Sequence, residues 1–289
     1  MLMPEEAKKG YLWVNGEFKP WAEATTHLIT HGLHYASSVF EGERAYNSRI
    51  FKSLQHTERL FNSANILGMK IPFSIEDIEK AKKYLLKKNN LDEAYIRAFV
   101  WRGGEEMGIS AQASSINVAV GAWYWPCYFP EKLRNNGIKL ATSKWLRPDP
   151  RTSPVQAKAA GGYMIGTMSK HTANDQGYHD ALLLDYKGRV GEASGANLFM
   201  IKDGVLKTPT TECVLNGITR QTIIALAKDN NITVEETDIM PDELYSADEV
   251  FLTGTAAEIT AVGEIDGHTY IVGDVTNLLR SEYEALVRR

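Results

Sequence analysis

The sequence has few cysteines, no strong excess of either charge and no long hydrophobic run. Its 289 residues include two cysteines, Cys127 and Cys213, which lie far apart and in no metal or redox spacing. A disulfide framework is therefore excluded, and this usage is typical of a reducing cytosol. The most apolar stretch, residues 116–129, is too short and too interrupted to span a membrane. Because the first residues show no basic segment followed by an apolar one, we expect no signal peptide.

The charge balance is close to neutral. Lysine and arginine number 32 and aspartate and glutamate 36, which gives a formal net charge of −4. This small acidic excess argues against nucleic acid or an anionic membrane surface as the main partner, while a local basic pocket for a small anion stays open. The hydrophobic content of 44% suffices for a sizeable core in one large domain or two ordinary ones. We therefore expect a cytoplasmic globular protein.

Several common catalytic motifs are missing. The sequence contains no P-loop and no G-x-G-x-x-G segment, which disfavours nucleotide enzymes of those types. It also lacks a G-x-S-x-G elbow and an H-E-x-x-H helix, so the corresponding hydrolases and zinc proteases are disfavoured. Three histidines, His27, His31 and His34, have a spacing that could place them on one helix face, but their segment contains a glycine and is more typical of a loop. We expect no metal site.

Local signals predict an α+β chain. Residues 11–21 should form a β-hairpin, because Asn15-Gly16 separates two β-rich runs. Apolar residues at helical spacing predict helices over 58–67 and 74–88, the second behind a Ser74-x-x-Asp77 capping box. The other expected elements are neighbouring strands over 94–103 and 116–125, a helix within 157–177, a strand pair within 180–209, a helix over 217–231 and a strand over 247–254.

A change in amino-acid composition divides the chain. Residues 123–137 carry two prolines and end in polar turn residues. We therefore expect a small N-terminal domain over 1–122, an interdomain loop over 123–137 and a larger cofactor-binding domain over 138–289.

Lys158 is the most suggestive single residue. Lysines are usually solvated surface charges, but this one lies among alanines and glycines, which let a flat ligand approach the backbone. A lysine that is shielded from water in such a site loses proton affinity and becomes a usable amine nucleophile. Glu192 follows a strand run and lies among small residues. It is either an ordinary turn carboxylate or a group that could hold a proton on a pyridinium nitrogen.

Two segments could bind an anion. Asn216-Gly217 precedes an amphipathic helix, so the backbone N–H groups of Ile218 and Thr219 would point outward at its start. Residues 254–257 form a turn of small residues after a strand, which is another potential nest of N–H groups. Each feature alone is more often an ordinary cap or turn.

Taken together, these segments are more specific. They are HYASSVFEGERAY (34–46), AYIR (94–97), KAAGGY (158–163), GEASGANLF (191–199), GITR (217–220) and FLTGTAAEIT (251–260). In order and spacing they resemble the branched-chain amino acid aminotransferases, class IV pyridoxal phosphate enzymes of fold type IV, over nearly the whole chain. The resemblance implies two domains, a small α/β N-terminal one and a larger pseudo-barrel C-terminal one. It also implies ping-pong transamination between L-leucine, L-isoleucine or L-valine and 2-oxoglutarate, in an assembly of at least two copies.

The resemblance also implies roles for single residues. Lys158 would bind pyridoxal 5′-phosphate covalently and move the reaction's proton, with Glu192 at the pyridinium nitrogen and Tyr163 at the phenolate oxygen. The phosphate would be held by Arg59, Ile218, Thr219 and Thr255. The residues implied for substrate are Tyr95, Ala256 and Ala257 at the α-carboxylate, Phe40, Trp125, Tyr128 and a partner subunit's Tyr35 at the pocket wall, and Arg97 at the γ-carboxylate of glutamate.

Two positions depart from the family pattern. Ala196 stands where many bacterial members carry a glutamate that supports the phosphate-binding arginine, so support for Arg59 must come from elsewhere. Glu43 occupies a position that the family often fills with an apolar residue. If Glu43 faced the pocket it would disturb aliphatic specificity, whereas if it faced solvent it would change nothing.

Three alternatives stay open at this stage. Within the fold, the chain could be a D-amino acid or (R)-amine transaminase, or an aminodeoxychorismate lyase, although the FEGERAY and AYIR segments favour the L-specific group. A non-catalytic protein that binds a phosphate ligand would not need Lys158. A metal-dependent enzyme that uses the three histidines would lose activity with a chelator.

Overall fold

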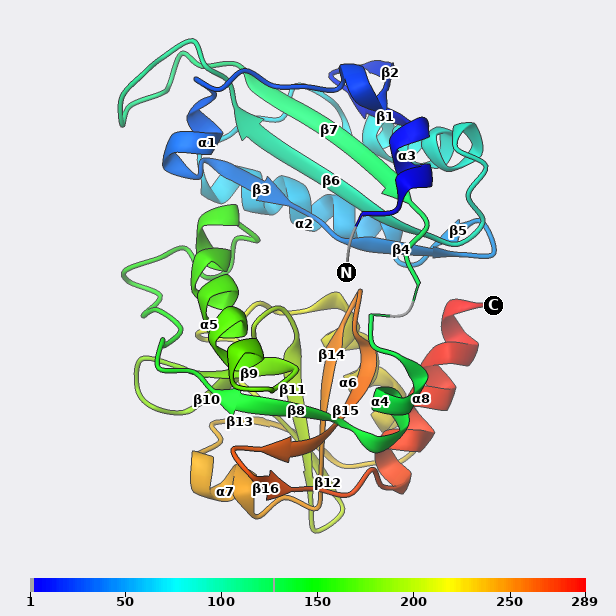
Figure 1. Cartoon of the computed structure of the whole chain (residues 1–289), viewed down its shortest axis with the longest axis vertical. Helices are drawn as coiled ribbons and strands as arrows, with labels where there is room; N and C mark the ends of the chain where they lie inside the picture. Colours follow the sequence, from blue (N-terminus) through cyan, green and yellow to red (C-terminus); the bar gives the residue numbers. More distant parts are fainter. Residues whose placement is uncertain (1–2, 127) are drawn as a thin grey trace. The chain divides into compact units, whose positions relative to one another are not determined.

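The computed structural model describes residues 3–126 and 128–289 (Figure 1). Contacts divide the chain into two compact units, unit 1 (Met1–Pro126 and Ala157–Gly161) and unit 2 (Cys127–Gln156 and Gly162–Arg289). The stretch 123–137, which we expected to link two domains, contributes residues to both. Cys127 lies outside the described residues, and Cys213 is buried as a free thiol. Across the described ranges, no helix has both the length and the apolar composition of a membrane span.

Unit 1 is a seven-stranded sheet with helices on one face. Its strands follow the order β2-β1-β7-β6-β4-β5, and β3 also pairs with β6. Its elements are η1 (Glu5–Lys9), β1 (Tyr11–Val14), β2 (Glu17–Pro20), η2 (Trp21–Glu23), α1 (His31–Tyr35), β3 (Ser38–Phe40), β4 (Glu43–Tyr46), β5 (Arg49–Ile50), α2 (Ser53–Ile66), α3 (Ile75–Lys88), β6 (Ala94–Arg102) and β7 (Ile116–Trp123).

The local predictions for unit 1 are confirmed. The hairpin of β1 and β2 turns at Asn15 and Gly16, which both have positive φ and so match the right-handed twist of the strands. The Ser74 hydroxyl accepts the Asp77 N–H while the Asp77 side chain accepts the Ser74 N–H, which completes the capping box at the start of α3. Helix α2 begins five residues before the predicted start, at Ser53.

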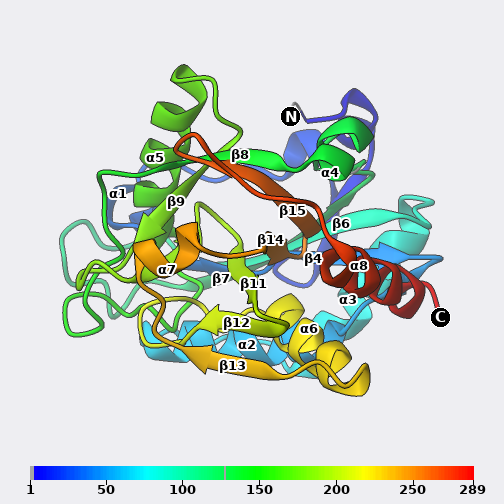
Figure 2. The same ribbon diagram turned by 90° about the horizontal axis from the view of Figure 1, so that it is seen from below.

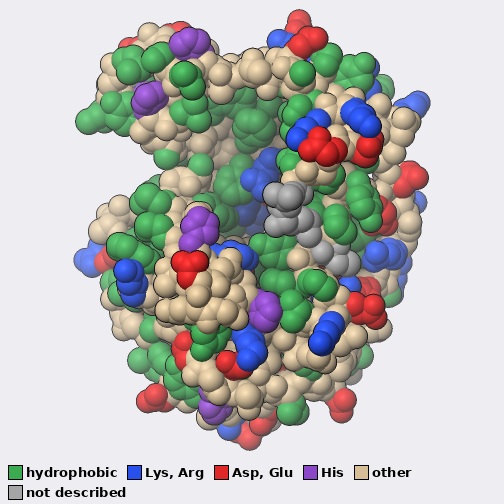
Figure 3. All heavy atoms as spheres, in the orientation of Figure 1, with side chains coloured by type: hydrophobic (Ala, Val, Ile, Leu, Met, Phe, Trp, Pro, Cys, Tyr) green, Lys and Arg blue, Asp and Glu red, His purple; other side chains and the backbone are tan. Residues whose placement is uncertain are grey.

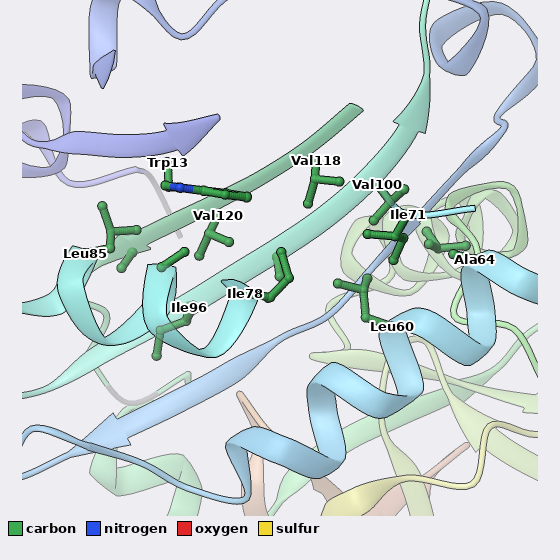
Figure 4. Packing of buried hydrophobic residues seen from close by; sticks show 14 of the residues in the cluster. Trp13, Leu60, Ala64, Ile71, Ile78, Leu85, Ile96, Val100, Val118 and Val120 are labelled. Carbon is green, nitrogen blue, oxygen red and sulfur yellow. The ribbon is translucent and has the colours of Figure 1, made fainter. Parts of the chain in front are cut away.

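The core of unit 1 lies between the sheet and helices α2 and α3. Figure 4 shows Leu60 on α2, and Ile78 and Leu85 on α3, directed at the strands that carry Ile96 and Val120. All five side chains are fully buried. Each buried aliphatic side chain stabilises the fold by about 1.5–3 kcal/mol relative to exposure, so this layer holds α2 firmly against the sheet.

Unit 2 contains a nine-stranded sheet and the longer helices α5, α6 and α8. Its elements are α4 (Glu131–Asn136), β8 (Ile138–Thr142), α5 (Tyr163–Asp175), β9 (Asp180–Leu184), β10 (Val190–Ala193), β11 (Asn197–Lys202), β12 (Val205–Pro209), α6 (Ile218–Asp229), β13 (Val234–Thr237), α7 (Pro241–Tyr245), β14 (Glu249–Gly254), β15 (Glu258–Ile265), β16 (His268–Thr269) and α8 (Asp274–Val287). The short η3 (Ala160–Gly162) leads into α5.

Six strands of unit 2 close on themselves. The order is β10-β9-β8-β15-β14-β11, and β10 pairs again with β11, so the path returns to its start (Figure 2). Apolar residues from these strands, including Leu140, Leu198 and Leu252, fill the interior. The expected pseudo-barrel is therefore confirmed. The segment 180–209, predicted as a strand pair, holds four strands, because turns at 185–189, 194–196 and 203–204 divide it.

Candidate active site

The residues singled out from the sequence divide between the two units. Unit 1 carries Tyr35, Phe40, Arg59, Tyr95, Arg97, Trp125 and Lys158. Unit 2 carries Tyr128, Tyr163, Glu192, Ile218, Thr219, Thr255, Ala256 and Ala257.

Lys158 is held to unit 1 through its backbone. Its N–H donates to Ser63 Oγ on α2 at 3.0 Å, and its carbonyl accepts the Phe40 N–H at 3.1 Å. The next residue, Ala159, forms an antiparallel bridge with Val39 on β3. The half-buried side chain places Nζ 5.0 Å from the centroid of the Phe40 ring. The lysine is therefore fixed at its main chain while its amine lies over an aromatic face.

Arg59 is paired with a fully buried carboxylate. Arg59 donates from Nε to Glu41 Oε1 at 2.6 Å and from Nη2 to Glu41 Oε2 at 2.9 Å, and His56 Nδ1 donates to Oε2 at 2.7 Å. Burial alone would raise the pKa of Glu41, but the charge of Arg59 and the hydrogen bond from His56 outweigh it and lower the pKa to about 2. Glu41 is thus ionised at neutral pH. Ala196 cannot support Arg59, and Glu41 supplies the carboxylate that does so within unit 1.

Glu43 faces neither solvent nor a pocket. Its side chain is 1% exposed and accepts a hydrogen bond from the fully buried Lys82 on α3 at 2.8 Å. Lys82 also bonds Glu79 and the hydroxyls of Thr57 and Ser53. Burial raises the pKa of the Glu43 carboxyl more than the nearby Lys82 lowers it. Neither sequence-based alternative for Glu43 is right, because the partner is a lysine 39 residues away in the chain.

A polar and aromatic group surrounds the break between β3 and β4. The Tyr95 hydroxyl accepts a hydrogen bond from Arg97 Nη2 at 2.8 Å, and the Arg97 guanidinium lies 4.5 Å from the centroid of the Phe40 ring. The Tyr95 ring packs edge-on against Trp125 at 4.6 Å. A Cβ at Gly42 would overlap the Tyr95 hydroxyl, so glycine is required for this close approach. The structure brings these four predicted substrate residues together around Gly42.

The histidine segment forms hydrogen bonds within the chain. His31 bonds Ser37 Oγ through Nδ1 and the Gly108 carbonyl through Nε2, and His34 Nε2 bonds the Leu28 carbonyl. Among residues 3–126 and 128–289 no group of three metal-binding side chains occurs. The last residue of α1, Tyr35, stacks on His31 and is 47% exposed.

In unit 2, Glu192 lies on β10 beside two polar side chains. Its carboxylate lies 3.1 Å from Arg147 Nε and accepts a weak 3.4 Å bond from Asn197 Nδ2. Arg147 and Glu192 are both nearly buried, at 13% and 12% side-chain exposure. A guanidinium beside a carboxylate favours its charged form. This arrangement suits a carboxylate that has to stay anionic beside a cationic ring nitrogen.

The start of α6 adjoins this carboxylate through Asn197. The N-cap is Gly217, and no side chain caps this end of the helix within the described part of the chain. A Cβ at Gly217 would overlap Asn197 Oδ1, so the chain needs glycine there. The first N–H groups of a helix have no partner inside it and favour anions. The backbone of Ile218 and Thr219 therefore offers donors close to Asn197, which in turn contacts Glu192.

The turn from β14 to β15 lies against the same region. Residues 255–257 join the two strands, and a Cβ added at Gly254 would lie 3.6 Å from both the Ala196 side chain and the Gly195 carbonyl. Thr253 pairs with Asn197 across β14 and β11. The buried Thr253 hydroxyl has no hydrogen-bond partner among the described residues. Unit 2 thus gathers a carboxylate, a helix start, a small-residue turn and an unsatisfied hydroxyl at one end of its sheet.

Tyr128 and Tyr163 connect to α5. Lys170 donates to the Tyr128 hydroxyl at 3.0 Å and pairs with Asp180 at 2.8 Å. Burial lowers the pKa of Lys170, but the negative charge of Asp180 outweighs burial and raises this pKa overall. Tyr163 is the first residue of α5, directly after Gly162.

These groups fit the cofactor that the sequence implies. Pyridoxal 5′-phosphate has a carbonyl carbon, a ring nitrogen and a phosphate. The chain holds an amine on Lys158, a carboxylate on Glu192 and donors suited to a phosphate on Arg59 and the start of α6. The Thr253 hydroxyl, which has no hydrogen-bond partner among the described residues, agrees with a ligand that binds unit 2.

Sequence reasoning missed several supporting residues. They are Glu41, His56, Ser63, Lys82, Arg147, Lys170 and Asn197. Two of them lay inside quoted segments, Glu41 in FEGERAY and Asn197 in GEASGANLF. The others carry no local signal, because each is defined by a partner that is distant in sequence.

Comparison with known proteins identifies full-length relatives. The family described as amino-transferase class IV matches residues 38–265. A branched-chain-amino-acid aminotransferase of Pseudomonas aeruginosa is 42% identical over 287 residues, which cover 97% of this chain and 94% of the relative. A crystal structure of the T.th. branched-chain amino acid aminotransferase with pyridoxamine 5′-phosphate matches with a TM-score of 0.94 at 40% identity, over 98% of this chain and 96% of that one. The complex of the same T.th. enzyme with N-(5′-phosphopyridoxyl)-L-glutamate matches over the same shares at 40% identity with a TM-score of 0.93.

Proposed function

The chain belongs to the class IV aminotransferase family, and we propose that it is a branched-chain amino acid aminotransferase. Its reaction moves the amino group between L-leucine, L-isoleucine or L-valine and 2-oxoglutarate in two ping-pong halves. The observation that carries this proposal is the near full-length similarity to aminotransferases of that name. A relative bound to a phosphopyridoxyl derivative of L-glutamate supports both the cofactor and a glutamate-type partner substrate.

Pyridoxal 5′-phosphate, when bound, supplies an electron sink for the electron pair released at the substrate Cα. Lys158 Nζ would hold the cofactor through its carbonyl carbon, and the same amine, when free, would accept the proton from the substrate Cα as general base. Glu192, which lies 3.1 Å from Arg147 Nε, would pair with the protonated ring nitrogen. Tyr163 would donate to the ring oxygen. The phosphate would be held by Arg59, the N–H groups of Ile218 and Thr219, and Thr255.

The substrate residues are those that the family resemblance implies. Tyr95, with the main chain of Ala256 and Ala257, binds the α-carboxylate. Arg97, whose guanidinium already donates to Tyr95 and stacks on Phe40, would donate hydrogen bonds to the γ-carboxylate of glutamate. Apolar walls come from Phe40, Trp125 and Tyr128, which suit a branched aliphatic side chain.

A second copy of the chain belongs to the proposal. Around α1, unit 1 exposes an apolar surface formed by Leu28, Leu33, Tyr35, Met107 and Ile109, which are between 47% and 88% exposed. Figure 3 shows hydrophobic and histidine side chains gathered on the end of unit 1 that carries α1. Monomeric proteins seldom expose such a group without a use. We propose at least a dimer in the cytoplasm, with Tyr35 directed to the partner's site and residues 123–137 as the link between a small and a large domain.

An absorbance titration tests this function. The protein is mixed with pyridoxal 5′-phosphate, and L-leucine or D-alanine is added in separate experiments. We expect a cofactor band that L-leucine alone converts to that of pyridoxamine 5′-phosphate. Conversion by D-alanine instead would favour a D-amino acid transaminase of the same fold. Lys158→Ala should abolish the band, whereas the control Lys80→Ala, at an exposed position on α3, should keep it. A wild-type protein without any band would refute the proposal.

A further inference from the structure

We propose that Glu41, assisted by His56, is the positioning residue that aims Arg59 at the cofactor phosphate. This inference rests on the proposed function, because it takes Arg59 as a phosphate ligand. Position 196, where the resemblance implied that many bacterial members carry a supporting glutamate, is an alanine here and carries no carboxylate. The chain supplies a different carboxylate, from the segment between β3 and β4.

The geometry of the pair is that of a fixed fork. Both oxygens of Glu41 accept from the same guanidinium, at 2.6 Å and 2.9 Å, which defines its plane. The Glu41 side chain is 0% exposed and that of Arg59 is 15% exposed, so water competes little for either group. Arginine has several rotatable bonds, and a two-point contact removes most of that freedom before any ligand binds.

Glu41 is itself held from three sides. His56 Nδ1 donates to Oε2 at 2.7 Å, the Gly42 N–H donates to the same oxygen at 3.3 Å, and the Glu41 N–H donates to the Ala98 carbonyl on β6 at 2.7 Å. His56 and Arg59 are three residues apart on α2, so both side chains lie on the helix face that meets Glu41.

The same two elements also hold Lys158. Ser63, four residues after Arg59 on α2, accepts the Lys158 N–H, and Phe40, directly before Glu41, donates to the Lys158 carbonyl. The amine that binds the cofactor's carbonyl carbon and the guanidinium that binds its phosphate therefore share one support within unit 1. Because the Glu41 side chain itself pairs with Arg59, replacing that side chain should affect the phosphate end of the cofactor in particular.

The test compares two ligands that differ only by the phosphate. Dissociation constants for pyridoxal 5′-phosphate and for pyridoxal are measured on the wild type and on Glu41→Gln, which keeps the size of the side chain and removes its charge. We expect the dissociation constant for pyridoxal 5′-phosphate to rise by about ten- to hundredfold. This change corresponds to the free energy that hydrogen bonds to charged groups usually contribute. The constant for pyridoxal should change by less than about twofold, since pyridoxal makes no phosphate contact.

Glu43→Gln is the matched control. Glu43 is as buried as Glu41 and also ion-paired, but its partner is Lys82. A general loosening of unit 1 would affect both variants and both ligands alike, whereas the positioning role predicts a change in the ratio of the two constants for Glu41→Gln only. If Glu41→Gln does not fold, Glu41→Asp, which is one methylene too short for the fork, is measured by the same ratio.

A double-mutant cycle tests whether Glu41 acts through Arg59. In an Arg59→Ala background, Glu41→Gln should have little further effect on the affinity for pyridoxal 5′-phosphate, because its action passes through the missing guanidinium. An equal loss in both backgrounds, or an unchanged or tighter affinity in Glu41→Gln alone, would overturn the inference. Either result would leave the proposed function intact as long as the wild type binds the cofactor, and a wild type that does not bind it would refute the function itself.

Discussion

The charge state of Glu41 makes a quantitative prediction about stability. Its pKa is about 2 in the folded chain and 4.5 in the ordinary case. One pKa unit corresponds to about 1.4 kcal/mol, so the difference stabilises the folded state by about 3 kcal/mol at neutral pH. Because the folded pKa is the lower one, this contribution is fully present above about pH 4.5 and is lost as the pH falls toward about 2. Glu41→Gln removes it at every pH.

Urea unfolding can measure this difference. Trp145 is the one of the six tryptophans that lies in unit 2, so a Trp145→Phe background confines the fluorescence signal to unit 1. In that background the free energy of unfolding is determined for the protein with Glu41 intact and for its Glu41→Gln variant, between about pH 7 and about pH 3. We expect a gap of about 3 kcal/mol at neutral pH that narrows steadily on acidification.

Glu43→Gln should show the opposite pH trend. Burial raises the folded pKa of Glu43 above its usual value, so ionisation of this carboxyl opposes folding. The advantage of the wild type over Glu43→Gln should therefore shrink as the pH rises above about 4.5. A wild-type advantage over Glu41→Gln that stays constant across the whole pH range would refute the reasoning, since Glu41 would then not be an ionised partner of Arg59.

Two further variants test other contacts. Gly42→Ala should destabilise unit 1 by about 1–3 kcal/mol, because the new methyl group overlaps the Tyr95 hydroxyl. Removing that hydroxyl with Tyr95→Phe should recover part of the loss in urea unfolding, and equal losses in both backgrounds would contradict this cause. Lys170→Met should cost about 3 kcal/mol, because it leaves the buried Asp180 carboxylate without its cation. Since the pKa of Lys170 is raised, its contribution is present at neutral pH and is lost only above about pH 10.5, so the gap to wild type should be flat from about pH 6 to pH 9.

The local structure of this protein was predictable because its signals lie within a few residues of one another. The hairpin turn at Asn15-Gly16 and the Ser74–Asp77 capping box each need only neighbouring residues, and both formed as expected. The motif segments likewise identified the family, since their order along the chain is itself sequence information. The closed barrel followed from that resemblance, whereas the division of 180–209 into four strands had to come from the structure.

The sequence by itself determined the family and predicted which residues carry chemistry, and only the tertiary structure decided which side chains are partners. The family resemblance implied Arg59, but its support by Glu41 spans 18 residues, and residue 196 is an uncharged alanine. The sequence left Glu43 between pocket and solvent, and the fold placed it against Lys82. Ser63 meets the Lys158 N–H across 95 residues. Such pairs depend on how α2 and α3 pack on the sheet. A buried charge needs a partner, and the packing decides which side chain is close enough to be that partner.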